Sequence, residues 1–413
     1  MQVRVWFAVV SPVLALLAGP AGAVEWQGKI ETVGGIPTYR NPSRPIDAPI
    51  TMKAEPLWTL GTDEEAEGEF FGVVTSILEA ADGTVYLLDS QLSEIKAFSA
   101  DGAYLRTFGP EGECPVEFRR ARDMVFLPNG NLGVAQPRPA RLIALTPEGT
   151  PAQDFVPKGE DPNGMVMMRG AQRTGPGLVL EINRMVRSEG SLTRKVLLTA
   201  YDPAGNPGTT YFTHESSMDF ANPVFREIDM APTRVWRAGP DGRLYRAAAD
   251  GSYAIHVHGP GGAVEKVYAV NKPPRARNAD ELKEARESMF FRGPVNPTVE
   301  ASPNAPAIRE IFYRPGDELW VMNGIDNYEL PKGTAVIFDV INAKGEYVRR
   351  ITVEGDFDIE GDLLVFGAER LYVVRRFRDA MAVLFGNGSE SEADAEDAEP
   401  IEITAYRLVR KGV

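Results

Sequence analysis

Cysteine and histidine are scarce in this chain of 413 residues, which has one cysteine and three histidines. A single cysteine cannot form a disulfide within the chain, so burial of apolar side chains must hold the fold together. We expect that cysteine, Cys114, to be an inert, partly buried turn residue without a redox role. The histidines that remain for metal or acid–base chemistry are His214, His256 and His258.

Several catalytic motifs and an excess of basic charge are also missing. The chain has no Gly-x-Ser-x-Gly elbow, no His-Glu-x-x-His and no phosphate-binding glycine loop, so nucleophilic serine, zincin and P-loop chemistry lack support. Lys and Arg number 44 against 58 Asp and Glu, a formal net charge of −14. This balance argues against nucleic acid as a partner.

Long apolar runs are absent after the first 23 residues. The first segment contains a basic residue, Arg4, then an apolar stretch from Val5 to Leu17, and then small residues ending at Ala23. This order is the pattern of a secretory signal peptide. Residues 1–23 are therefore predicted to be a signal peptide. With no later spanning run and no cysteine at the cleavage point, we expect an exported soluble protein, periplasmic or extracellular, without a membrane span or lipid anchor.

A repeated strand-and-turn pattern dominates the rest of the chain. Residues 75–109 contain four β-rich runs, with tight turns at Asp82-Gly83 and Asp101-Gly102. Asp-Gly between β-rich runs is a strong hairpin signal, because glycine adopts the positive φ that such turns need. Residues 122–156 repeat the pattern with Asn129-Gly130 in the first turn. Two adjacent copies indicate a repeat architecture.

Four looser copies follow, at residues 165–214, 233–270, 308–353 and 357–408. Six units of four short strands predict an all-β fold, a six-bladed β-propeller with four-stranded antiparallel blades.

The stretch before the first copy resembles the end of a repeat. We expect residues 51–61 to be the closing strand of the last blade, residues 24–50 to be an N-terminal extension, and residues 51–413 to form one propeller.

The first copy resembles the NHL repeat. Residues 68–118 carry a Glu-Phe pair, then Asp-Gly-x-Val-Tyr-x-x-Asp and Ile-x-x-Phe-x-x-Asp-Gly, and the other copies match mainly in turn placement. The resemblance implies a six-bladed propeller. It does not imply one function, because propellers of this type include binding scaffolds, sensors, lactonase-like hydrolases and an amidating lyase.

Two segments interrupt the repeats. Residues 271–307 are rich in proline and contain a run of helix formers from Asn278 to Phe291, so we expect one short inserted helix, placed either over a face of the ring as a lid or partner surface, or at the side of a blade. Residues 387–400 are acidic, with almost no large apolar side chain, and are expected to be a disordered loop.

Charged residues recur where the innermost strands are expected to begin, at the mouth of the central channel. Arginines from several blades could bind an anionic or mixed-charge ligand there, or could pair with neighbouring carboxylates and fill the axis. The candidates for a ligand site are Arg122, Asp123, Arg169, Arg234, Trp236, Arg309, Glu310 and Asp358.

Two metal sites are conceivable from the sequence. His256 and His258 lie two residues apart, so on a strand they face one side and could bind zinc, with His214 or Glu265 as a third ligand; solvent-facing histidines are the simpler interpretation.

A central calcium ion, as in a lactonase-like site, would need oxygen ligands. Suitable oxygens belong to Asp123, Glu181, Asn183 and Asp358.

The sequence favours a noncatalytic binding module that recognises an unidentified protein, peptide or small molecule with loops on one face of the propeller. No cofactor is evident. The alternative is a hydrolase or lyase that depends on calcium or zinc and holds its ion on the propeller axis. A purely structural role in an envelope assembly is a third possibility.

Overall fold

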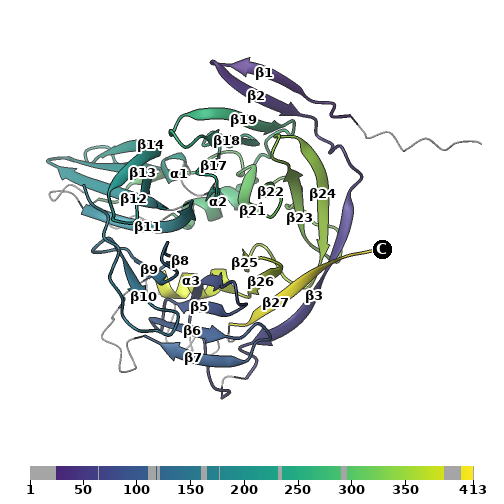
Figure 1. The fold of residues 1–413 in the computed structure, drawn as a ribbon. Helices are drawn as coiled ribbons and strands as arrows, with labels where there is room; N and C mark the ends of the chain where they lie inside the picture. Colours follow the sequence, from purple (N-terminus) through teal and green to yellow (C-terminus); the bar gives the residue numbers. More distant parts are fainter. Residues whose placement is uncertain are drawn as a thin grey trace, which may run out of the picture.

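The computed structural model describes residues 25–63, 65–109, 118, 121–159, 165–175, 177–230, 235–289, 295–385 and 401–412. Most of the described chain is β-strand, and the larger sheets stand around a central space, which the first strand of each repeat faces (Figure 1). The prediction of a β-propeller type of fold is confirmed at this level. The expected signal peptide, Cys114, Arg234 and the acidic segment 387–400 lie outside the described residues.

The first sheet follows the sequence pattern directly. Its strands are β4 (Val74–Glu79), β5 (Val85–Asp89), β6 (Glu94–Phe98) and β7 (Tyr104–Phe108), in antiparallel order. Gly83 and Gly102 have φ of 88° and 86° in the turns between strands, which is why glycine follows aspartate there.

The second sheet is shorter than expected. It consists of β8 (Asp123–Phe126), β9 (Leu132–Gln136) and β10 (Arg141–Leu145), and the segment after β10 makes only isolated bridges, at Pro151 and Phe155. The prediction of four strands in every blade is therefore wrong here. Proline has no N–H to donate to a ladder, so a regular fourth strand through residue 151 is disfavoured.

The third sheet has the longest strands and reaches outward from the ring (Figure 1). Its strands are β11 (Met165–Thr174), β12 (Gly177–Ser188), β13 (Ser191–Tyr201) and β14 (Pro207–Asp219).

The fourth sheet has six strands. Four of them follow the repeat: β16 (Trp236–Ala238), β17 (Leu244–Ala247), β18 (Ala254–His258) and β19 (Val264–Val270). Two more come from the expected N-terminal extension, because β2 (Ile36–Asn41) pairs in parallel with β19, and β1 (Lys29–Val33) pairs with β2. The expectation of purely antiparallel blades is therefore wrong in this sheet.

The largest sheet has eight strands and includes both ends of the fold. In spatial order it contains β21 (Ile308–Arg314), β22 (Glu318–Asn323), β23 (Thr334–Ile341), β24 (Tyr347–Glu354), β3 (Ile50–Leu60), β27 (Ile403–Arg410), β26 (Arg370–Val374) and β25 (Leu363–Phe366).

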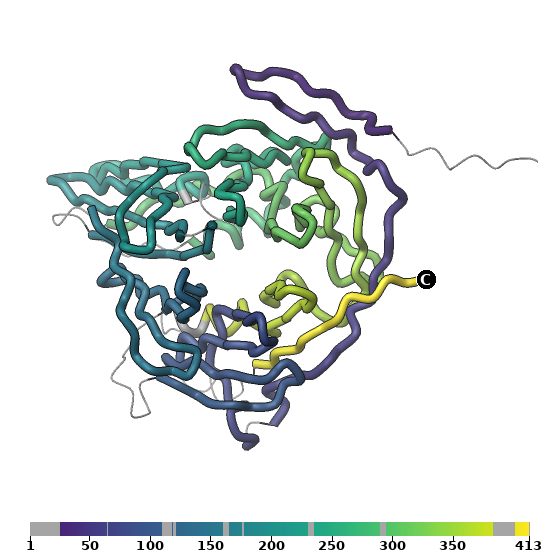
Figure 2. The backbone as a smooth tube through the Cα atoms, viewed as in Figure 1, coloured from purple at the N-terminus to yellow at the C-terminus, as the bar shows by residue number. Residues whose placement is uncertain are grey.

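The strand β3 joins the two halves of this sheet. Its first residues pair in parallel with β24, and residues 52–60 pair antiparallel with β27. Figure 2 shows the purple N-terminal segment beside the yellow C-terminal strand.

Three helices lie in the described part of the chain: α1 (Glu227–Met230), α2 (Ala279–Glu287) and α3 (Phe377–Phe385). Only α2 corresponds to the predicted insert, so the expectation of a single helix is wrong. The α3 segment contains the strong helix formers Ala380, Met381 and Ala382, and Phe377 and Ala380 pack against an apolar cluster, which stabilises a helix that the sequence analysis did not predict. A small parallel pair, β15 (Val224–Arg226) with β20 (Thr298–Glu300), links the start of α1 to the insert.

Apolar clusters fill the spaces between neighbouring sheets. One of them contains Leu87 of the first sheet together with Leu60, Tyr372 and Ile403 of the eight-stranded sheet, so the beginning and end of the repeat region are packed together. This contact closes the ring without a disulfide. No helix among the described residues is long and apolar enough to cross a bilayer.

Candidate functional site

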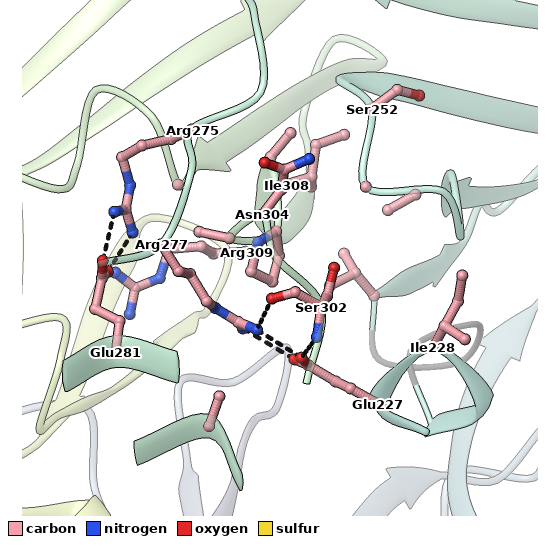
Figure 3. Close-up of a pocket in the computed structure, with 18 of the residues that line it drawn as sticks. Glu227, Ile228, Ser252, Arg275, Arg277, Glu281, Ser302, Asn304, Ile308 and Arg309 are labelled. Atoms are coloured by element: carbon pink, nitrogen blue, oxygen red, sulfur yellow. Dashed lines mark hydrogen bonds and ion pairs between the residues drawn. The ribbon is translucent and has the colours of Figure 1, made fainter. Parts of the chain in front are cut away.

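A cavity of about 690 Å³ lies at the end of the ring where β16 and β21 begin (Figure 3). Its walls include the loop of residues 247–252 between β17 and β18, part of α2, and residues 302–309 at the end of the insert. The insert predicted from the sequence therefore forms one side of a pocket, next to the starts of β16 and β21.

The floor of the cavity is built from small and apolar residues. Short side chains leave room above the backbone, and a ligand with an apolar body would displace water from this surface. The residues of the floor are Val235, Ala247, Ala248, Ala249, Ala305, Pro306, Ala307 and Ile308.

A buried ion pair, Arg277 with Glu227, fixes the insert at one wall. The two guanidinium nitrogens of Arg277 donate to the two carboxylate oxygens of Glu227 at 2.5 and 2.9 Å, and the side chains are only 10% and 7% exposed. The backbone carbonyl of Ser302 accepts a hydrogen bond from Arg277 at 2.9 Å, and the backbone N–H of Ser302 donates one to Glu227 at 2.9 Å. This clamp joins α1 to both ends of the insert (Figure 3).

A second arginine, Arg275, orders the start of α2. It donates to both oxygens of Glu281 at 2.9 and 2.6 Å, and its guanidinium lies 3.6 Å from the centre of the Tyr328 ring. The hydrogen bond from Arg275 lowers the pKa of the Glu281 carboxyl, and burial opposes it. Asn278 and Glu281 also form a capping box, so the carboxylate holds the helix end and the arginine together.

Two further ion pairs face the cavity and are more exposed. Arg309 forms a bidentate pair with Glu360, with side chains that are 25% and 52% exposed. Arg378 pairs with Glu284 of α2, and both of these side chains are more than half exposed. The pKa of Glu360 is lowered, first by its hydrogen bond with Arg309 and further by the charges of Arg378 and Arg275, while burial opposes the shift.

The helix α2 buries none of its residues. The N-cap residue Asn278 donates a hydrogen bond to Tyr328, and Glu281 and Glu284 of the helix form ion pairs with Arg275 and Arg378. Exposed ion pairs contribute about 0–1 kcal/mol each. The helix α2 is therefore attached to the rest of the protein far more weakly than the sheets are attached to one another.

The predicted channel residue Asp123 has a separate environment. Its carboxylate accepts hydrogen bonds from the hydroxyl of Ser76 at 3.2 Å, from the N–H of Met124 at 2.9 Å and from the N–H of Ala171 at 3.1 Å. Burial raises the pKa of this carboxyl, and these hydrogen bonds together with the charge of Arg237 oppose the shift. Asp123 therefore links the inner strands of three consecutive sheets.

Other channel candidates are paired with protein groups. Glu310 forms an ion pair with Arg237 at 3.2 Å, and the indole N–H of Trp236 donates to Glu181 at 3.2 Å. Asp358 accepts the N–H of Glu360 at 3.0 Å and so orders the turn that carries Glu360.

The remaining arginines of the predicted site are dispersed. Arg122, directly before β8, and Arg169, on β11, are half-buried, and Arg309 belongs to the cavity. Arg234 lies outside the described residues. The structure therefore does not gather the described candidates into one site: Asp123 is bonded to Ser76 and Ala171, Glu310 to Arg237, and Arg309 to Glu360.

The histidines and the proposed metal ligands do not converge. His256 contacts a guanidinium nitrogen of Arg246 at 3.1 Å, His258 contacts the carbonyl of Gly262 at 3.0 Å, and burial lowers the pKa of both rings. The other proposed ligands are separated: His214 lies 3.5 Å from Asp229, and Glu265 pairs with Arg243.

No group of three His, Cys, Asp or Glu residues within the described ranges is placed to hold a metal ion. Asn183 is buried on β12 with its carbonyl oxygen lacking a hydrogen-bond donor, whereas the Asp123 oxygens are engaged by protein donors. The residues named for calcium and zinc therefore do not fit a metal site.

Sequence reasoning missed most of the residues that line the cavity with charge. A local signal was present for two of them, since Arg275 and Arg277 follow Pro273-Pro274 in the insert. The partner of Arg277, Glu227, lies 50 residues away in the sequence, and the partner of Arg309, Glu360, lies 51 residues away, so no local pattern connects either pair.

No protein-family model matches this chain, and no curated protein matches it. Among solved structures, virginiamycin B lyase from Staphylococcus aureus is 10% identical, with 87% of this chain and 100% of that chain covered and a TM-score of 0.43. Regucalcin, a calcium-binding protein from Agrobacterium tumefaciens, is 11% identical, with 87% and 96% covered and a TM-score of 0.40. A luciferin-regenerating enzyme is 14% identical, with 87% and 97% covered and a TM-score of 0.34. At this degree of likeness, the activities in these names remain those of the named proteins.

Proposed function

We propose that this chain is an exported, six-bladed propeller of the NHL type that binds a small ligand or a short peptide segment in the cavity beside α2. The function is recognition, and the bound molecule lies on the apolar floor between the insert and the ends of the inner strands.

The grouping of the strands supports the six-bladed arrangement. The eight-stranded sheet divides at β3 into two halves, each with an inner strand, β21 or β25, and the other four sheets of the ring each have one inner strand. The six groups are β4–β7, β8–β10, β11–β14, β16–β19, β21–β24 and β25–β27 with β3. The basic, apolar and small-residue pattern of residues 1–23 supports export.

The observation that carries the proposal is the cavity itself. A volume of about 690 Å³ lies within the range of small-molecule sites, roughly 300–1,000 Å³. Its floor is apolar and its rim carries arginines and carboxylates. In ligand sites, apolar walls usually supply most of the binding energy, and a few polar groups fix the orientation of the ligand. The insert that forms its wall is an interruption of the repeat, and insertions on a rigid ring are where binding sites are expected.

The test is a titration with N-phenylnaphthylamine, a neutral fluorophore whose emission rises in apolar surroundings. We expect saturable binding at one molecule per chain. Replacing Ala249, a residue of the floor, with Phe fills the cavity and should weaken binding by at least about tenfold.

The matched control is Ala103→Phe, because Ala103 is exposed in the turn between β6 and β7 and lies outside the cavity lining. Both variants should keep the native melting temperature within about 2 °C. An absence of binding to the native protein, or equal binding by the two variants, would contradict the proposed site.

A further inference from the structure

The four arginines of the cavity differ in how firmly their carboxylate partners are held. Arg277 and Glu227 are both almost completely buried and share hydrogen bonds with Ser302, so this pair is part of the framework. Arg275 is held by Glu281 and by the Tyr328 ring, and Glu281 is itself tied to the helix cap. Neither pair can release its arginine without loosening the insert.

The pair of Arg309 and Glu360 is different because only one partner is fixed. Arg309 lies at a register shift in β21, between Ile308 and Glu310, and bulges of this kind redirect a side chain out of the regular ladder. The stem of Arg309 packs against Gly324, where an added Cβ would lie 3.4 Å from its Cγ. The guanidinium is therefore held toward the cavity by the backbone around it.

Glu360, in contrast, lies on a turn before β25 and is 52% exposed. Surface ion pairs change an equilibrium constant by about 1.4- to 5-fold, and this bidentate pair, with Arg309 25% exposed, belongs at the upper end of that range. Rotation of this carboxylate into water would thus leave a positioned guanidinium fork at a small cost, and two parallel N–H groups are then free for another oxyanion.

The charges around this position favour an anion. Arg378 and Arg275 also line the cavity, and both act on the Glu360 carboxyl in addition to Arg309. A negative group at this place contacts Arg309 directly, and the charges of Arg378 and Arg275, which are themselves paired with Glu284 and Glu281, act on it from farther away. Glu360 occupies the place that this arrangement would offer to an external oxyanion.

We infer that the cavity selects an organic anion, whose oxyanion group replaces Glu360 on the guanidinium of Arg309 while its apolar body lies on the alanine-rich floor. This inference rests on the proposed function, since it names the ligand class of the same cavity. Glu360 acts as a tethered competitor that the ligand must displace, and Arg309 determines specificity for the anion.

The experiment compares two probes that differ by one charged group. Anilinonaphthalene sulfonate has the ring system of N-phenylnaphthylamine and adds a sulfonate, so the ratio of the two affinities isolates the oxyanion contribution. Each probe is titrated into the native protein and into Glu360→Gln, Arg309→Ala and Arg309→Lys, and the binding component that Ala249→Phe removes is analysed.

We expect Glu360→Gln to raise the affinity for the sulfonate by about two- to fivefold, because it removes the competitor. Arg309→Ala should lower it by about tenfold or more, and Arg309→Lys should also lower it, because an ammonium lacks the bidentate fork. In each variant the affinity for the sulfonate should change by a larger factor than the affinity for the neutral probe, which has no oxyanion. The control is Arg243→Ala, since Arg243 pairs with Asp241 and Glu265 at the opposite end of its sheet and should change neither probe.

Binding of both probes without any response to these variants would overturn the inference and leave the proposed function in place. Failure of the neutral probe to bind the native protein would remove the proposed function instead. If Glu360→Gln lowers the melting temperature, Arg309→Lys decides the matter, and an unchanged sulfonate affinity in that variant would overturn the inference.

Discussion

The buried pair of Arg277 and Glu227 yields the sharpest prediction about stability. Replacement of Arg277 with Ala leaves the Glu227 carboxylate, 7% exposed, in the interior without its bidentate partner. Removal of one partner from a buried pair costs about 3–5 kcal/mol, mostly because the other charge stays desolvated.

This cost can be converted into a shift of melting temperature. An unfolding entropy of about 2.1 cal/mol/K per residue gives about 0.9 kcal/mol per degree for 413 residues. If the insert unfolds together with the ring, Arg277→Ala should lower the melting temperature by about 3–6 °C. Hydrogen exchange over residues 275–289 should accelerate by about 150-fold or more, up to the limit set by native local opening.

Two companion variants make the prediction decisive. Arg378→Ala removes an arginine of the same cavity whose side chain is 53% exposed, and it should shift the melting temperature by less than about 1 °C. The double variant Arg277→Met with Glu227→Gln should recover most of the loss, because it removes both buried charges and keeps an acceptor for the N–H of Ser302. The reasoning is refuted if the Arg277 and Arg378 variants are indistinguishable in melting temperature and in hydrogen exchange.

Two other predictions concern the stability of α2 and the closure of the ring by β3. The pKa of Glu281 is lowered from 4.5 in the folded protein, so its stabilisation of α2 is complete above that pH and is lost as the pH falls below it. Exchange over residues 279–287, corrected for intrinsic rates, should therefore rise between about pH 5 and about pH 3 in the native protein, and the same rise in Glu281→Gln would contradict this origin. Deletion of residues 50–60 removes eight residue pairs between β3 and β27. At about 0.2–1 kcal/mol per pair, the free energy of unfolding should fall by about 2–8 kcal/mol. An unchanged melting curve would show that β3 does not close the ring.

Local sequence alone predicted the positions of several turns and of one helix. Asp82-Gly83 and Asp101-Gly102 form the turns expected of them, because glycine reaches a positive φ at little cost. The helix of the insert was also predictable, since Asn278 and Glu281 have the spacing of a capping box. The three-stranded second sheet and α3 were missed because Pro151 and the run Ala380 to Ala382 have local preferences that the repeat pattern obscured.

The sequence by itself determined that this chain builds hairpins in repeated units, because each turn depends on residues next to one another. Only the tertiary structure decided which charges meet. Arg309 and Glu360 are 51 residues apart, and Arg277 and Glu227 are 50 apart, so their pairing depends on the order of sheets around the ring. Likewise, β3 pairs with a strand more than 340 residues later, through Leu60 and Ile403, because burial of the shared apolar cluster brings the two ends together.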